Sequence, residues 1–399
     1  MEHIFFTAAT WLGLAVIASI IAYHLRISIA LVEICVGMIV AAIATYSNFN
    51  GILSPNHEWL KFLASAGAVM LTFLAGAEIE PDVMRKKIKE ASVVGFIGFF
   101  APFIGCSLIA KYMLNWDIRA SFLAGIALST TSMAVVYSVM FETGLNKTEF
   151  GKGILASCFI NDLGTVVALG LLFAPFNIKT IVFGIFTLVV LFILPSISNW
   201  LKKVYAGKTA AIRTKWVIMV LFSLGAFALW SGSEAVLPVY LVGMVLAEFS
   251  SSDLLWLKRL RTLTVGFLTP FYFIRAGSLA SIFLLVASPA TFLVLFGGKV
   301  LSKIFGLYPF IAIFRENKDE RWYYTLMMST GLTFGTISAM YGLTHNIITQ
   351  AQYSFLVATV IGSAVIPTII ASVLFFPRHL LCEVTLPEVE SAEDTLADE

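Results

Sequence analysis

The sequence predicts an all-α integral membrane protein with about 13 transmembrane helices, built as an inverted-topology repeat in which two broken helices cross at the middle of the membrane. Three observations support this fold class. The composition is 59% hydrophobic and only 13% charged, with a mean hydropathy of +0.91, far more apolar than a soluble globular chain. Apolar segments of membrane-spanning length follow one another along the chain. Short motifs also recur about two hundred residues apart.

The apolar segments favour helices over a transmembrane barrel. The chain holds 34 Phe residues and shows no alternating ten-residue pattern of apolar and polar positions, which a barrel would require. A helix needs about 20 mostly apolar residues to cross the bilayer. The segments that meet this requirement are 4–23, 27–47, 59–80, 91–114, 118–141, 150–175, 177–200, 215–231, 235–249, 262–285, 288–313, 322–343 and 349–376.

Three of these segments have a distinct character. Segment 4–23 is too long and too uninterrupted for a cleaved signal peptide, so we expect it to be the first span. Segment 150–175 carries an amide and a carboxylate, Asn161 and Asp162, near its middle. Segment 177–200 is followed by a basic loop and is expected to join the two halves of the repeat.

The cations of the loops alternate along the chain. One set of loops holds only Lys61, Lys111, Arg119 and Lys179, whereas the other set holds 19 of the 26 Lys and Arg residues. By the positive-inside rule, the basic loops are cytoplasmic. We therefore expect a multi-pass protein of the inner or plasma membrane, with its N-terminus outside and its C-terminus in the cytoplasm.

The repeat is visible in two pairs of motifs. Phe73–Glu78 resembles Phe273–Ser278, and Ser129–Thr131 resembles Ser329–Gly331. The copies are separated by an odd number of spans, which inverts the second copy in the membrane. The Ser, Thr and Gly residues fall in mid-span and predict broken helices, whose free amides and carbonyls can hold an ion. Close helix packing through small residues is the alternative explanation.

Asp162 is an ionisable side chain at bilayer depth. Such a group costs roughly 2.5–3.5 kcal/mol to insert, so it is retained for a purpose or neutralised by a partner. A carboxylate shielded from water can hold either a proton or a hard monovalent cation. The sequence therefore predicts an ion or proton pathway at Asp162, and a purely structural pair with a core cation is the alternative.

Several short motifs share a likeness to one known family. They are Ser129–Val136, Glu142–Gly144, Ile160–Leu163, Val32–Gly37, Phe73–Glu78 and Pro270–Phe273. Together they resemble the Kef/Nap-type branch of the monovalent cation:proton antiporters, within the sodium/proton exchanger superfamily. The resemblance covers nearly the whole chain and is most specific over residues 118–175.

The resemblance implies a homodimer in which a mobile core moves against a dimerising scaffold. The scaffold helices would be 1–80 and 216–285, the core ion-transport helices 91–175 and 288–376, the linker helix and cytoplasmic loop 177–215, and the acidic cytoplasmic tail 377–399.

The resemblance also assigns roles to individual residues. It places the ion-binding aspartate at Asp162, where Na⁺ would bind, and its neighbour at Asn161, where an amide is typical of electroneutral members. Thr131 and Ser132 fall on the broken-helix crossing beside the site. The core lysine falls on Lys299, with Lys303 one turn further on as the other register.

Arg275 has no counterpart in the usual family pattern. A guanidinium does not deprotonate in a protein, so Arg275 cannot carry the transported proton and needs a permanent partner or a water-filled cavity. The available carboxylates are Glu78, in the repeat-related position, and Glu33. We expect structural pairing with one of them.

These observations predict a secondary-active Na⁺(Li⁺)/H⁺ antiporter, electroneutral because Asn161 cannot titrate, working by alternating access and serving pH homeostasis. A K⁺/H⁺ exchanger or Kef-like K⁺ efflux protein lacking its regulatory domain is one alternative. A Na⁺-coupled symporter of an organic anion is another. The sequence cannot rank Na⁺ against K⁺, since both use the same oxygen ligands. No phosphate-cradling glycine loop is present, so we expect no enzyme activity, no cofactor and no nucleic-acid partner.

Overall fold

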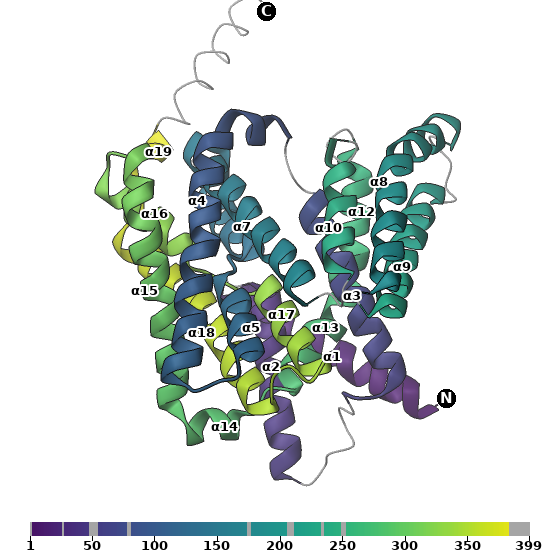
Figure 1. Ribbon diagram of the computed structural model, residues 1–399, viewed down its shortest axis with the longest axis horizontal. Coiled ribbons are helices and arrows are strands. Elements are labelled where there is room, and N and C mark those ends of the chain that lie inside the picture. Colours follow the sequence, from purple (N-terminus) through teal and green to yellow (C-terminus); the bar gives the residue numbers. More distant parts are fainter. Residues whose placement is uncertain are drawn as a thin grey trace, which may run out of the picture. The chain divides into compact units, whose positions relative to one another are not determined.

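The computed structural model describes residues 2–25, 28–47, 55–77, 81–173, 177–205, 211–232, 235–248 and 253–382. These residues form helices and their connections, with no strand among them (Figure 1). Glu78 and the tail residues 383–399 lie outside the described residues. Nine of the described helices are long and apolar enough to cross a membrane. The predicted all-α membrane fold is confirmed.

The helices follow the expected spans in order. The N-terminal and middle helices are α1 (Glu2–Leu25), α2 (Ile29–Tyr46), α3 (Glu58–Ala77), α8 (Ile178–Tyr205), α9 (Ile212–Ser231), α10 (Val236–Val245), α12 (Leu254–Leu263), the π-helix η3 (Thr264–Leu268), α13 (Thr269–Ser278) and α14 (Ile282–Ala287). The helices of the repeat are α4 (Pro81–Leu108), the π-helix η1 (Ile109–Met113), α5 (Ile118–Ser129), α6 (Met133–Thr143), the 3₁₀ turn η2 (Leu145–Lys147), α7 (Glu149–Phe173), α15 (Pro289–Phe314), α16 (Lys318–Met327), α17 (Thr333–Thr344), α18 (Gln350–Leu374) and the short α19 (His379–Cys382).

The order of elements from α4 to α7 recurs from α15 to α18. In each set a long helix is followed by two half-helices and a second long helix, and the half-helices begin at Ile118 and Met133 in the first set and at Lys318 and Thr333 in the second. The constant offset explains why the Ser-Thr motifs recur in the sequence. The two sets are the two copies of the predicted repeat.

One expected span is shorter than the hydropathy suggested. Segment 262–285 is interrupted because α13 ends at Ser278, whose hydroxyl donates to Arg275 O at 2.9 Å, and α14 begins only at Ile282. Hydropathy does not detect this end, because the residues on both sides of it remain apolar.

The chain divides into two compact units. Unit 1 comprises residues 1–82, 163–289 and 336–357, and unit 2 comprises residues 83–162, 290–335 and 358–399. Both units draw on distant parts of the sequence. Each contains residues from both copies of the repeat.

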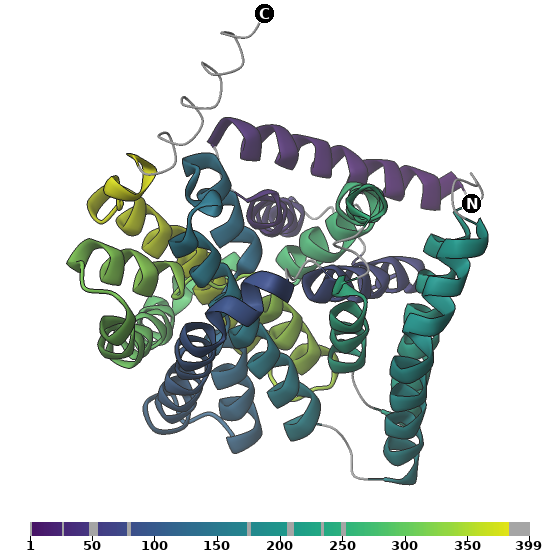
Figure 2. The same ribbon diagram turned by 90° about the horizontal axis from the view of Figure 1, so that it is seen from above.

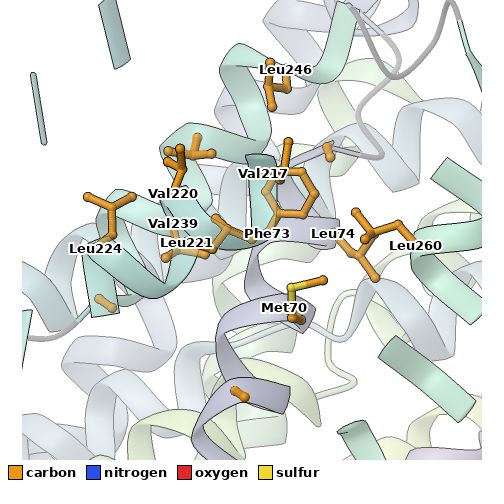
Figure 3. Packing of buried hydrophobic residues seen from close by; sticks show 14 of the residues in the cluster. Met70, Phe73, Leu74, Val217, Val220, Leu221, Leu224, Val239, Leu246 and Leu260 are labelled. Atoms are coloured by element: carbon orange, nitrogen blue, oxygen red, sulfur yellow. The ribbon is translucent and has the colours of Figure 1, made fainter. Parts of the chain in front are cut away.

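Unit 1 is held by apolar packing. Met70, Phe73 and Leu74 of α3 lie in one cluster with Leu221 of α9 and Val239 of α10, and each is at most 4% exposed (Figure 3). Helices α8 and α9 run beside each other in both views of the ribbon, and the rings of Phe186 and Phe227 stack at 4.2 Å between centroids (Figures 1 and 2). This cluster contains no ionisable side chain.

Helices α2 and α13 of unit 1 touch through glycines. A Cβ at Gly37 would collide with Ile274 O, and a Cβ at Gly277 would collide with Ile34 O. The two backbones can come this close only because both positions lack a side chain.

This close approach predicts a position-dependent effect of glycine substitution. Gly277→Ala should destabilise the protein by about 1–3 kcal/mol, since the added methyl must displace backbone. Gly184→Ala, on α8 with no atom within 4 Å of its Cβ position, is the matched control and should leave stability unchanged. Thermal unfolding of the purified protein in detergent measures both, and equal midpoints would contradict the packing account.

Candidate functional site

Asn161 and Asp162 lie half-way along α7, as the sequence suggested. Asn161 is fully buried and Asp162 is 2% exposed. Asn161 donates a long hydrogen bond of 3.5 Å from Nδ2 to Gly95 O on α4. Oδ1 of Asp162 has no hydrogen-bond partner among the described residues. A buried carboxylate oxygen without a donor attracts a proton or a cation.

The two helix breaks contact each other inside unit 2. Thr131, in the break between α5 and α6, donates from Oγ1 to Met328 O at 2.8 Å. The backbone N–H of Ser132 donates to Oγ1 of Thr330, in the break between α16 and α17, at 3.4 Å. The predicted crossing of two broken helices is confirmed.

The residue types of the breaks explain why the helices end there. Ser129 and Thr130 donate from their hydroxyls to Ile126 O and Ala127 O at the end of α5, at 2.8 and 3.1 Å. At the end of α16, Thr330 donates to Met327 O at 2.8 Å. Hydroxyls thus satisfy carbonyls that a continuous helix would have paired with backbone N–H groups.

Two lysines of α15 reach the crossing, and both are fully buried. Lys303 donates from Nζ to Oγ1 of Thr131 at 3.0 Å. Nζ of Lys299 lies where a Cβ of Gly331 would be, beside the second break, and has no hydrogen-bond partner among the described residues. Glycine at 331 therefore leaves the space that the Lys299 ammonium occupies.

The sequence pointed to one core lysine and left its register open between Lys299 and Lys303. The structure brings both to the crossing. Lys303 hydrogen-bonds the first break, and Lys299 lies beside the second. Two amines and one carboxylate in a site closed to water cannot all be charged without a net positive charge.

Arg275 belongs to unit 1. Its Nε donates to Pro55 O at 2.8 Å, and Nη1 lies 3.6 Å from the sulfur of Met340. No ion pair joins it to Glu33 in the part of the chain that the structure describes, and Glu78 falls outside that part. A carbonyl and a thioether, rather than the expected carboxylate, are the partners seen for this guanidinium.

A charged cluster at the helix ends of unit 2 was not anticipated from the sequence. Arg315, after α15, binds both carboxylate oxygens of Glu90 on α4, at 2.7 and 2.9 Å from Nη2. Arg315 also lies 4.0 Å from Glu320, which His379 contacts at 2.8 Å. The sequence feature that could have indicated this cluster is the loop charge pattern, which placed Arg315 and the basic residues before Glu90 on the same side of the membrane.

Interrupted helices that cross beside buried amines, in the same unit as a buried mid-helix carboxylate, are typical of membrane transport proteins. The chain matches the family model described as sodium/hydrogen exchanger, transmembrane, over residues 12–376. It therefore belongs to the sodium/hydrogen exchanger family, and the likeness noted in its motifs is confirmed.

Individual relatives agree with this assignment. Probable Na(+)/H(+) antiporter 3 of Methanocaldococcus jannaschii is 27% identical over 232 residues, which cover 55% of this chain and 58% of that protein. Na(+)/H(+) antiporter NhaS4 of Synechocystis sp. is 24% identical over 380 residues, which cover 86% of this chain and 92% of that protein. The match thus spans little more than half of the first relative and nearly all of the second.

A solved structure supports the fold. The structure of the sodium proton antiporter MjNhaP1 of Methanocaldococcus jannaschii at pH 8 matches with a TM-score of 0.68 and 18% identity. The match covers 93% of this chain and 96% of that one. The helix order and the two interruptions thus belong to a fold already seen in a solved structure.

The Glu90–Arg315 pair predicts a strong dependence of stability on one buried charge. Glu90→Gln should destabilise the protein by about 3 kcal/mol, because it leaves the Arg315 guanidinium without its counter-charge. Glu149→Gln is the matched control, since Glu149 is 65% exposed and its pairs with Lys87 and Lys152 are at the surface; it should change stability by less than about 1 kcal/mol. Thermal unfolding tests both, and a control as damaging as Glu90→Gln would contradict the interpretation.

Proposed function

We propose that the protein is a secondary-active sodium (or lithium)/proton antiporter that binds its cation and its proton in turn at Asp162. The observation that carries this proposal is the meeting of the Asp162 helix, two buried lysines and both helix breaks inside unit 2. Family membership gives the class of transport, and the site gives the residues.

The exchange follows from competition for one carboxylate. Without a cation, the negative charge of Asp162 is balanced by a proton or by the ammonium of Lys303 in the same unit. A bound Na⁺ takes over that role, so a proton leaves the site as the cation enters. The oxygen ligands available nearby are the Asp162 carboxylate, the Asn161 amide, the hydroxyls of Thr131 and Ser132, and water.

Alternating access requires the site to move as a body. Asp162, Lys299, Lys303 and both breaks belong to unit 2, so a displacement of that unit would carry the site intact. Unit 1, with its apolar cluster, would be the scaffold and would form a homodimer through its lipid-facing helices. The basic loops would face the cytoplasm of a cell whose inner or plasma membrane holds the protein.

The neutral amide of Asn161 sets the stoichiometry in this proposal. An amide does not titrate, so Asp162 exchanges one proton for one monovalent cation and no net charge crosses the membrane. The two lysines stay in the site throughout the cycle and are not counted as transported charges. Exchange is then electroneutral.

The first prediction concerns Asp162 itself. Proteoliposomes that hold a pH gradient reported by a fluorescent dye should lose the gradient when Na⁺ or Li⁺ is added, and Asp162→Asn should reduce this response to that of protein-free liposomes. Asp117→Asn is the matched control, since Asp117 caps α5 by accepting from Arg119 N at 3.0 Å and is exposed. The control should exchange like the wild type.

An Asp162→Asn protein that still exchanges would overturn the shared-site mechanism. A response to K⁺ alone would retain the site and reassign the cation. A response that needs an added organic anion would make the protein a symporter.

The second prediction concerns voltage. Wild-type exchange should be the same with and without a K⁺/valinomycin clamp on the membrane potential, because its cycle moves no net charge. Asn161→Asp adds a carboxylate that can carry a second proton, so exchange should become voltage-dependent. A clamp effect on the wild type would instead mean that another group, Lys299 or Lys303, contributes a transported proton.

A further inference from the structure

A groove runs between α8 and α9 of unit 1, and none of its lining residues belongs to the ion site. Its volume is about 240 Å³, and its walls include Val190 and Leu194 from α8 and Trp216, Met219 and Ser223 from α9. Both helices are candidate membrane spans, and only 17% of the apolar window of α8 is buried. From Trp216 to Ser223 the groove follows about 10 Å of helix, roughly a third of the hydrocarbon core.

Two polar atoms lie without partners at one end of this groove. Nε1 of Trp216 is buried and has no hydrogen-bond partner among the described residues, and the same holds for Oγ of Ser198, one turn beyond Leu194 on α8. A buried donor that is left without a hydrogen bond costs about 1–3 kcal/mol. An acceptor supplied from outside the chain would remove this cost.

The same end of the helix pair is basic. Lys203 lies in the last turn of α8, and Lys215 lies in the first turn of α9, immediately before Trp216. Both are exposed, and neither forms an ion pair with a described residue. The neighbouring Arg213 forms an ion pair with Asp253, with 2.7 Å between Nη1 and Oδ2. Two unpaired cations thus flank the groove where the helices leave the membrane.

We propose that the α8–α9 groove binds one anionic phospholipid. The acyl chain lies along Met219 and Val220, the ester and phosphate oxygens accept from Trp216 Nε1 and Ser198 Oγ, and the headgroup charge pairs with Lys203 and Lys215. From the membrane interior to its surface, the helix pair presents apolar walls, then donors without partners, then cations. This order matches the acyl chain, the ester and phosphate oxygens, and the charged headgroup of a phospholipid. Indole N–H groups favour this interfacial depth.

The occupant is anionic because the two lysines distinguish headgroups. A zwitterionic lipid offers the same chain and ester but no net charge. Each lysine near an anionic headgroup contributes about a five-fold preference, so the pair contributes about thirty-fold. This preference is independent of transport and can be measured on the protein without any ion gradient.

The test is native mass spectrometry of the full-length protein, titrated with phosphatidylglycerol and, separately, with phosphatidylcholine. The wild type should retain one phosphatidylglycerol per chain at about thirty-fold lower lipid concentration than phosphatidylcholine. Lys203→Gln combined with Lys215→Gln should abolish this difference. Lys258→Gln combined with Arg259→Gln, two exposed cations of α12 in the same unit, is the matched control and should keep it.

Trp216→Phe tests the contribution of the indole N–H independently of the charges of Lys203 and Lys215. It keeps an aromatic ring in the groove but removes the N–H, so it should weaken retention of both lipids while leaving the preference between them. Equal headgroup preference in the wild type and in the Lys203/Lys215 double variant would overturn the proposal. Efficient bismaleimide cross-linking of two copies through Met219→Cys in phosphatidylglycerol vesicles would also overturn it, because the groove would then be covered by a second chain.

Discussion

A carboxylate buried among membrane helices is the constraint on which the rest of the structure depends. Asp162 is 2% exposed, and one of its oxygens has no donor among the described residues. Such a group is stable only when a proton, a cation or an ammonium balances its charge. Two buried lysines of α15 lie in the same unit as Asp162, and Lys303 reaches the first helix break by donating to Thr131 Oγ1.

The residues at the two helix interruptions stabilise the backbone there. Each break frees backbone carbonyls, which the Ser and Thr residues of the breaks take up at 2.8–3.1 Å. Glycine at 331 leaves room for the Lys299 ammonium. At the far ends of the same helices, the Glu90–Arg315 pair ties α4 to α15. Unit 1 is held largely by apolar packing and glycine contacts, although it also buries Glu33 and Arg275.

Much of this could be predicted from the sequence because it depends on composition and spacing. Hydropathy located the spans, mid-span hydroxyls located the breaks, and a lone mid-span carboxylate located Asp162. What the sequence left open depends on side-chain reach across the fold. Lys299 and Lys303 are one turn apart at equal hydropathy, so only the geometry could bring both to the crossing. The described partners of the Arg275 guanidinium are the carbonyl of Pro55 and the thioether of Met340. Both residues are distant from Arg275 in sequence.

The central claim is that a cation and a proton compete for one buried carboxylate. The most direct test is to add Na⁺ to the purified protein in weakly buffered detergent solution and count the protons released for each Na⁺ bound. The account predicts one proton per Na⁺ for the wild type, with release declining above the pH at which the site has already lost its proton. Na⁺ binding at a buried site with no proton release at any pH would contradict it.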